Sequence, residues 1–520
     1  MIDLTKHPEE PQPQPAPTPV YYGAPNAGFV PYPMPTVVQP KKKTEFTRAE
    51  LGFSFAVFLL SFMLIRFAMC SPTGFVTTAV FAGLITAALL FMKKSGIKGD
   101  RHTALTAGVM YVFSAVYFVT DNEFIKALNT LFLILCGLWL LYQYGSSDRR
   151  VPRFLPLVML QAALEYPFSH FGKMTAAAAE SGRRTKIGRN VGAVFAGLLI
   201  TIIPTIVIGS LLISADSGVE KMLGGVTRFV TSKEVFKAGF QLMFAYPVGS
   251  YIYGAFFANS HRDPAADLSE SACEEHLGKA RRVRNMVIYT ALTPICGLYT
   301  LFFISQANYL LSAFLNRLPE GLSHAEYARR GFFELLAIVI IDLFIICVSN
   351  LVAKDVGADG GKPAALRFYT GAVSFFTLVM IASALSKMVM YISEYGLTEL
   401  RLYTGWFMVL CAFVFLLVIV KQFRRGMVIM RPLAAVFVVM FALLTFGRPD
   451  YVIARFNTEM YEAGRLERFD TDYLWSLSDD AKMYCLQNGS APRVTNAKKY
   501  RKAFDNTDIS TIYVNGRMES

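Results

Sequence analysis

The chain has 520 residues, of which 54% are hydrophobic and 17% are charged, and its mean hydropathy is +0.40. Because soluble domains carry about 25% charged residues, this composition excludes an ordinary soluble domain and predicts a membrane protein. The formal net charge of +13 is interpreted as Lys and Arg in cytoplasmic loops, where polytopic proteins collect positive charge. It does not indicate a nucleic-acid partner.

Residues 1–47 are predicted to form a disordered cytoplasmic tail. Proline recurs through the segment, most densely at 11–19, and such sequences favour extended polyproline II structure and cannot bury a core. No apolar stretch typical of a signal peptide precedes residue 51. The lysine run at 41–43 lies just before the first apolar segment and favours a cytoplasmic N-terminus. A protein partner that binds this tail is one hypothesis.

About eleven segments are long and apolar enough to cross a bilayer, because a span needs about 20 predominantly apolar residues. The loops on one side carry most of the Lys and Arg, which places that side in the cytoplasm and the C-terminus outside. The predicted fold class is therefore all-α, a polytopic transmembrane helix bundle in the cell membrane with the lipid bilayer as its partner. The predicted spans are 51–70, 73–92, 103–120, 124–144, 191–213, 235–258, 285–305, 331–352, 369–391, 402–420 and 427–446.

Two of these spans are weaker than the rest. The segment 103–120 is short, and 124–144 contains Lys126 and Asn129 near its start. A further stretch after residue 150 is interrupted by prolines and is expected to lie in the membrane interface or to pack under the bundle. The expected parts are the disordered tail 1–47, the first four spans 48–150, the interfacial segment 151–190, the transmembrane core 191–446 and a small helical extracytoplasmic tail 447–520.

The span 331–352 contains two carboxylates, which are the clearest functional signal in the sequence. Glu334 lies only about 5 Å beyond Gly331 along the helix. Arg330 precedes Glu334 by four residues on the same face, so the two are expected to form an interfacial ion pair.

Asp342 lies about 16 Å beyond Gly331, near the middle of a hydrocarbon core about 30 Å thick. Its side chain cannot reach water from that depth, so it must face other helices or a wet cavity. We expect its partner to be a Ser, Thr, Tyr or Asn side chain on a neighbouring helix. An ionisable group at this depth marks a functional site by default.

Three predicted spans, at 191–213, 235–258 and 285–305, are interrupted by both Pro and Gly. Transporters build binding sites from interrupted helices, and in that case Tyr246, Tyr251 and Tyr253 would line a cavity. Kinks repaired by neighbouring helices are the alternative interpretation.

Catalytic and metal-binding templates are missing from the sequence. The seven cysteines are scattered singly, and no motif for a metal, a nucleotide or a nucleophilic serine stands in a usable context, so no metal or cofactor is predicted. A membrane-embedded transferase would need His324, Glu326 and Arg330 to converge on an external cleft. Glu326 has a structural interpretation as well, because it completes a capping box with Ser323.

Four stretches of sequence resemble a family of bacterial multi-pass membrane proteins known as a domain of unknown function (the 4153/4173 group). They are LPEGLSHAEYARRGFFELLA at 318–337, LISAD at 212–216, YGLTELRLYTGWFM at 395–408 and PDYVIARFN at 449–457. The resemblance extends over roughly residues 185–485 and implies a membrane topology. It implies no activity, because none is established for the family.

Three classes of function follow from these observations. The first is a transporter or a protein that handles lipids or other envelope components, which predicts a polar cavity around Asp342. The second is a non-catalytic envelope or signalling protein, which predicts a dry bundle and partners on the N-terminal tail or the outer face. The third is a transferase that acts on a lipid-linked substrate. The sequence does not decide whether the protein is an enzyme or what its oligomeric state is.

Overall fold

The computed structural model describes residues 46–69, 73–184, 233–262, 283–314, 332–354, 362–424, 426–466, 469–488 and 508–518, with a few positions between 197 and 211. All of these residues belong to the unit Phe46–Ser520. Almost all of the tail predicted at 1–47, and most of the span predicted at 191–213, lie outside the described residues. Within the described ranges the chain forms helices and no β-strand, so the all-α fold class is confirmed.

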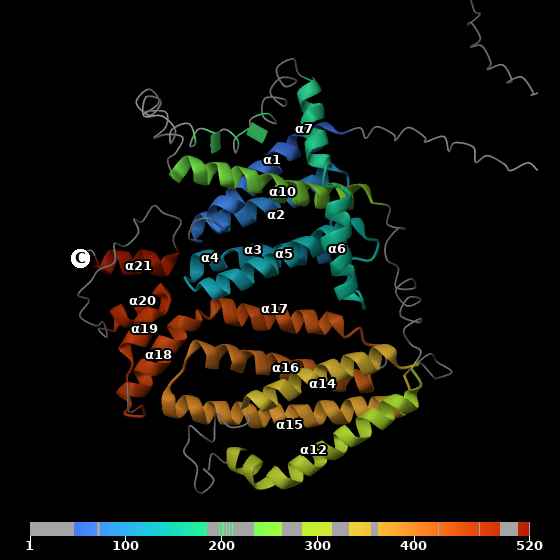
Figure 1. Cartoon of the computed structure of the whole chain (residues 1–520), viewed down its shortest axis with the longest axis vertical. Coiled ribbons are helices and arrows are strands. Elements are labelled where there is room, and N and C mark those ends of the chain that lie inside the picture. The colour runs from blue at the N-terminus through green and yellow to red at the C-terminus, as the bar shows by residue number, and fades with distance from the viewer. Residues whose placement is uncertain are drawn as a thin grey trace, which may run out of the picture. The chain divides into compact units, whose positions relative to one another are not determined.

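A first group of helices comes from the N-terminal half of the described chain. α10 packs against α1, α5, α6 and α7, and α2 packs between α1 and α3 (Figure 1). The helices are α1 (Arg48–Leu64), continued by a π-helix (Ile65–Met69), α2 (Phe75–Lys94), α3 (Arg101–Ser114), α4 (Val116–Val119), α5 (Glu123–Gly145), α6 (Leu155–Ser169), α7 (Lys173–Arg184) and α10 (Lys233–His261). Their boundaries follow from local sequence signals, such as the capping box of Thr47 and Glu50 before α1.

A second group of helices packs around α15. α12 and α14 both lie against it, and α16 makes its most extensive contact with it. The bounds are α12 (Asn285–Phe314), α14 (Phe332–Val352), α15 (Ala364–Tyr395) and α16 (Glu399–Phe423). The buried cores of α14, α15 and α16 form one apolar cluster that includes Val339, Met380 and Phe415.

Helix α17 (Met430–Phe446) joins the two groups. It packs on α16, and its Phe441 stacks against Phe113 at 5.6 Å and contacts Phe132 at 5.1 Å, both from the first group. Figure 1 shows α17 between the two sets of helices. Aromatic pairs of this kind bury large apolar area, so α17 is the apolar link between the groups.

The chain bends by 62° between α17 and α18 (Pro449–Glu462). Pro449 disfavours helical geometry at the residue before it, and Arg448 takes a left-handed conformation with φ of 49°. At the other end of α18, Gly464 has a φ of 68° and its amide donates to the Tyr461 carbonyl, so a glycine in the left-handed region ends this helix. The chain continues through α19 (Thr471–Ser476), α20 (Asp479–Gln487) and α21 (Ile509–Met518).

Eight helices of the described chain are long and apolar enough to span a membrane, or nine if the bent pair α17 and α18 is one span. The multi-pass helical character is therefore confirmed, but the count of about eleven is not. α10 has 29 residues but is not among the eight, whereas the two weaker predictions at 103–120 and 124–144 are. α6 and α7 pack on α10 and α1, while their place at a membrane interface stays a prediction.

Candidate functional site

Asp342 is fully buried in the middle of α14 and is held by hydroxyl groups from two other helices. The Tyr299 hydroxyl of α12 donates to Oδ1 at 2.5 Å, and the Thr377 hydroxyl of α15 lies 2.7 Å from Oδ2. The prediction that a hydroxyl on a neighbouring helix would be its partner is confirmed. Among the described residues, no Lys, Arg or His forms an ion pair with this carboxyl group.

The surroundings of this carboxyl are apolar. Val339, three residues before it in α14, and Val373 of α15 are fully buried, and Met380 of α15 is only 1% exposed. Transfer of a carboxyl group from water to such a site costs free energy unless its oxygens are hydrogen-bonded, and an ionised carboxylate costs far more. Both oxygens of Asp342 have a partner, so the site can hold this group without an orphaned atom.

Glu334 occupies a different environment from Asp342. Its side chain is exposed in the first turn of α14, and it attracts Lys387 of α15 electrostatically. Its predicted partner Arg330 lies outside the described residues, as do Glu326 and His324. The ion pair of Glu334 with Arg330 and the external cleft of a transferase therefore stay predictions.

The three tyrosines predicted to line a cavity lie on α10, and Figure 1 shows α10 on the opposite side of α17 from α14, the helix that carries Asp342. The Tyr251 hydroxyl donates to the Ala163 carbonyl at 2.8 Å and ties α10 to α6. Tyr246 is half-buried against an apolar cluster, and the neighbouring Tyr253 donates to the Glu50 carbonyl at 3.1 Å. These side chains secure α10 to α1 and α6, and Tyr251 also lines an apolar pocket between α2, α3, α5 and α10. The structure does not bring the tyrosines together with Asp342.

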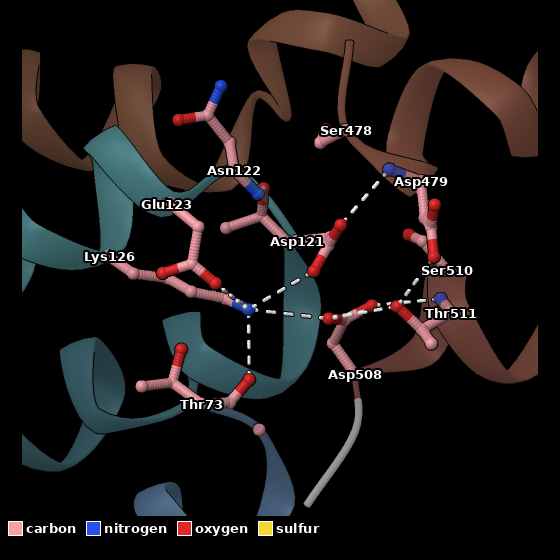
Figure 2. A network of polar contacts seen from close by, with 12 residues as sticks. Thr73, Asp121, Asn122, Glu123, Lys126, Ser478, Asp479, Asp508, Ser510 and Thr511 are labelled. Carbon is pink, nitrogen blue, oxygen red and sulfur yellow. Dashed lines mark hydrogen bonds and ion pairs between the residues drawn. The ribbon is translucent and has the colours of Figure 1, made fainter. Parts of the chain in front are cut away.

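Sequence reasoning missed a second site, where the start of α5 meets the C-terminal helices. We call it the C-terminal junction, comprising residues 120–126 and their polar partners in 448–511. Figure 2 shows its centre, the ammonium group of Lys126, which is only 2% exposed. It donates to the Thr73 carbonyl at 2.9 Å and lies 3.3 Å from Asp508 and 3.5 Å from Asp121. Glu123, one turn before Lys126, lies 4.0 Å away. One buried cation thus serves three carboxylates, two close to it in the sequence and one from the C-terminal segment.

Asp480, at the start of α20, is the second centre of the C-terminal junction. It is fully buried and accepts hydrogen bonds from the hydroxyls of Thr120 and Ser510. Arg448, the left-handed residue at the bend, adds an ion pair at 2.8 Å. The bend between α17 and α18 therefore points a guanidinium at Asp480, which compensates the burial of that charge.

Asn122 connects both helix groups to the C-terminal helices. Its Oδ1 caps α5 by accepting from the Ile125 amide at 2.9 Å. Its Nδ2 lies 3.0 Å from the Tyr403 hydroxyl of α16 and 2.9 Å from the Asp450 carboxylate of α18. The two amide hydrogens of an asparagine satisfy these two acceptors, so one side chain links three helices.

Within the C-terminal junction, the negative charge of Asp121 is not fully compensated. This residue lies between two candidate spans. Burial raises the pKa of Asp121 to about 7, helped by the charge of Asp508 and opposed by that of Lys126. Lys126 faces both Asp508, which is 2% exposed, and Asp121, which is 26% exposed. Its single charge therefore does not fully offset that of Asp121, and the Asp121 carboxyl keeps its proton to a higher pH than usual. The sequence feature that indicates this site is Lys126 itself. It is a cation inside an apolar segment, and it makes the prediction of a span at 124–144 weaker.

A family model described as a domain of unknown function (DUF4153) matches residues 107–486. The chain belongs to this family. The match confirms the resemblance inferred from the four motifs and begins at residue 107 instead of near 185, so it includes α5, Lys126 and Asp342 but not Thr73, Asp508 or Ser510 of the C-terminal junction. The family description names no activity, and it therefore assigns no role to Asp342 or Lys126. No curated protein and no solved structure matches the chain.

Proposed function

We propose that this member of the DUF4153 family is a membrane carrier and that Asp342 is the residue its transport cycle uses. The observation that carries this proposal is the full burial of Asp342, with hydroxyl partners on two other helices and no basic partner among the described residues. An apolar side chain would stabilise such a site at least as well. Ionisable groups inside transmembrane helices typically belong to substrate, ion or proton pathways.

The packing of α12, the helix that carries Tyr299, supports movement of this helix relative to Asp342. Only 11% of its candidate span is buried, the smallest share among the candidate spans, compared with 50% for α15. A helix with few buried contacts can shift at low free-energy cost. A movement of α12 would separate the Tyr299 hydroxyl from Asp342 and so couple helix position to the state of the carboxyl group.

The test uses cells that normally contain the protein, with its gene deleted and replaced by wild type, Asp342→Asn or Asp342→Leu. Growth and the intracellular solute profile are measured at matched membrane abundance. We expect both variants to behave like the deletion, whereas Ser374→Ala, which removes a buried hydroxyl of α15 bonded only to Thr370, should behave like wild type. If both Asp342 variants restore the wild-type profile, or if the deletion changes nothing, the carrier proposal is contradicted.

Handling of lipids is the second candidate function, and a specific pocket favours it. An apolar pocket with an empty volume of about 690 Å³, including its mouth, lies between α2, α3, α5 and α10. Ile134, which lines it, is 48% exposed, so the pocket opens to the surroundings of the helices. Within a bilayer those surroundings are acyl chains, so a lipid acyl chain is the occupant we propose. The pocket is lined by side chains such as Phe81, Met110, Leu133, Gly137, Ile252 and Phe256.

Photoactivatable palmitic acid, incorporated into phospholipid, tests the pocket directly. We expect crosslinks to map to its lining and to be lost in Gly137→Phe, because a side chain added there meets only the Met110 methyl at 3.5 Å and fills the space. Gly108→Phe is the matched control, since Gly108 on α3 is exposed and has no neighbour within 4 Å. Equal labelling of the two variants would exclude an acyl-chain site in this pocket.

A further inference from the structure

We propose that Asp342 is a proton-binding site, and that the Thr377 hydroxyl switches between two hydrogen-bonding directions as the proton binds and leaves. The inference deepens the carrier proposal and rests on it for its biological use, because it names the proton as the ion exchanged at the carrier's carboxyl. It follows from counting the hydrogens available to five neighbouring oxygen atoms, those of the Tyr299 and Thr377 hydroxyls, the two of the Asp342 carboxyl and that of the Val373 carbonyl.

The count begins at Thr377, whose single hydroxyl hydrogen has two acceptors within reach. Its oxygen lies 2.7 Å from Oδ2 of Asp342 and also 2.7 Å from the Val373 carbonyl, one turn back in α15. One hydrogen can be shared between two acceptors, but it cannot make two linear hydrogen bonds to both of them. Two full hydrogen bonds at these short distances need a second hydrogen, and Asp342 is the group that can carry it.

The neutral state satisfies every atom in the chain of contacts. The Tyr299 hydroxyl donates to Oδ1 of Asp342, the protonated Oδ2 donates to Thr377, and Thr377 donates to the Val373 carbonyl. A carbonyl oxygen has two lone pairs, so that of Val373 can accept this bond in addition to its helical one. All three side-chain hydrogens then have an acceptor.

The ionised state needs only one rotation. When the carboxyl O–H bond breaks, the proton passes to water and the electron pair stays on Oδ2. The Thr377 hydroxyl then turns its hydrogen from Val373 toward Oδ2, and the carboxylate receives two hydrogen bonds, from Tyr299 and Thr377. The reverse steps take up a proton from water. Both states are hydrogen-bonded without movement of a helix, which is what reversible proton binding in an apolar site requires.

Other titratable groups around the site are few among the described residues. Cys296 of α12 is close enough to interact electrostatically with Asp342, and Tyr299 contacts it directly. Cys411 of α16 belongs to the surrounding apolar cluster, Glu334 and Lys387 attract each other at the start of α14, and Cys347 is exposed on α14 itself. None of these groups replaces Asp342 as the proton carrier in the contacts described.

Infrared spectroscopy of the purified full chain in lipid nanodiscs tests the assignment. With ¹³C-labelled aspartate, the C=O stretch of a protonated carboxyl group is followed as the pH is raised over the range in which the protein stays folded. Asp121 also carries a proton near neutral pH and contributes a band that Asp121→Asn removes. We expect a second band that disappears as the pH rises and that is missing in Asp342→Asn. A band that persists at every pH, or no Asp342-dependent band at any pH, would overturn the proposal.

Variants of Thr377 test the switch, and Ser374→Ala is the control. Thr377→Ser keeps the hydroxyl and should leave the band in place, whereas Thr377→Val removes the acceptor and should shift the band to the frequency of a free carboxyl. Tyr299→Phe removes a donor to the ionised form, so the midpoint of the titration should move by about one to two pH units to higher pH. Identical bands in Thr377→Val and Thr377→Ser would contradict the switch.

Failure of this inference can be told from failure of the carrier proposal. If the band titrates but Asp342→Asn supports a wild-type solute profile in cells, the proton site stands and the carrier role falls. If Asp342→Asn abolishes that profile while the band does not respond to pH, the carrier stands and the proton assignment falls.

Discussion

The ammonium group of Lys126 lies 3.3 Å from the carboxylate of Asp508, and each side chain is only 2% exposed. This contact holds the last helix, α21, at the start of α5, across a separation of 382 residues. A hydrogen bond to a charged group contributes about 1.5–3 kcal/mol. We expect Asp508→Asn to lower the free energy of unfolding by about this amount and to speed amide hydrogen exchange in α21, measured in detergent by mass spectrometry.

The ion pair between Arg455 and Glu459 is the matched control for this prediction. Both side chains are more than half exposed, so solvent screens their attraction and Glu459→Gln should leave the melting temperature unchanged. Equal effects of Asp508→Asn and Glu459→Gln would mean that the Lys126 contact does not hold α21 in place.

Asn122 gives the second prediction, because its amide faces acidic groups on two other helices. Asn122→Asp keeps the cap of α5 but places a carboxylate where the amide lies 2.9 Å from Asp450 and 3.4 Å from Glu399. Asn122→Ala loses the cap, which costs about 1 kcal/mol. We expect Asn122→Asp to be the more destabilising of the two in thermal unfolding. The reverse order would show that the cap of α5 contributes more to the stability of the junction than the amide donors do.

Asp342 and Lys126 show how much of such a site can be predicted from a single sequence. A carboxylate in the middle of an apolar run signals burial, and the chemistry of its partner follows because a hydroxyl is a group that apolar helices commonly offer. Tyr299 and Thr377 could not be named, since they are 43 and 35 residues away and many hydroxyls are equally available. Which helices pack together decides the partner, and the sequence pattern of one helix does not contain that information.

Lys126 illustrates the opposite case, in which the signal was visible and misread. A lysine near the start of an apolar segment weakens the prediction of a span, and nothing in the sequence pattern gives Lys126 any other role. Its partners are a carbonyl before α2, Glu123 at 4.0 Å and two aspartates, one of them in the last described segment. Contacts between residues hundreds of positions apart leave no local pattern, so the C-terminal junction could be found only in the folded chain.

Asp121 leads to a prediction about pH. Its pKa is raised from 3.8 to about 7, chiefly by burial and then by Asp508. Between these values the folded junction keeps a proton that the unfolded chain has released, so the free energy of unfolding falls as the pH rises through this window and levels off above it. We expect the melting temperature to fall between about pH 5 and pH 7.5, and to fall less in Asp121→Asn. An identical slope in both proteins would contradict this account of the junction.

The final prediction concerns the side of the membrane on which the C-terminal junction lies. The charge pattern of the loops places the end of α2, with Lys93 and Lys94, in the cytoplasm and α19 outside. In a background whose seven cysteines are replaced by serine, Ser476→Cys on the exposed face of α19 should react with a membrane-impermeant maleimide added to intact cells. Lys94→Cys, which is equally exposed, should react only after the membrane is opened. Labelling in the opposite order would invert the topology, and labelling of both from one side would mean that the number of spans between them is even.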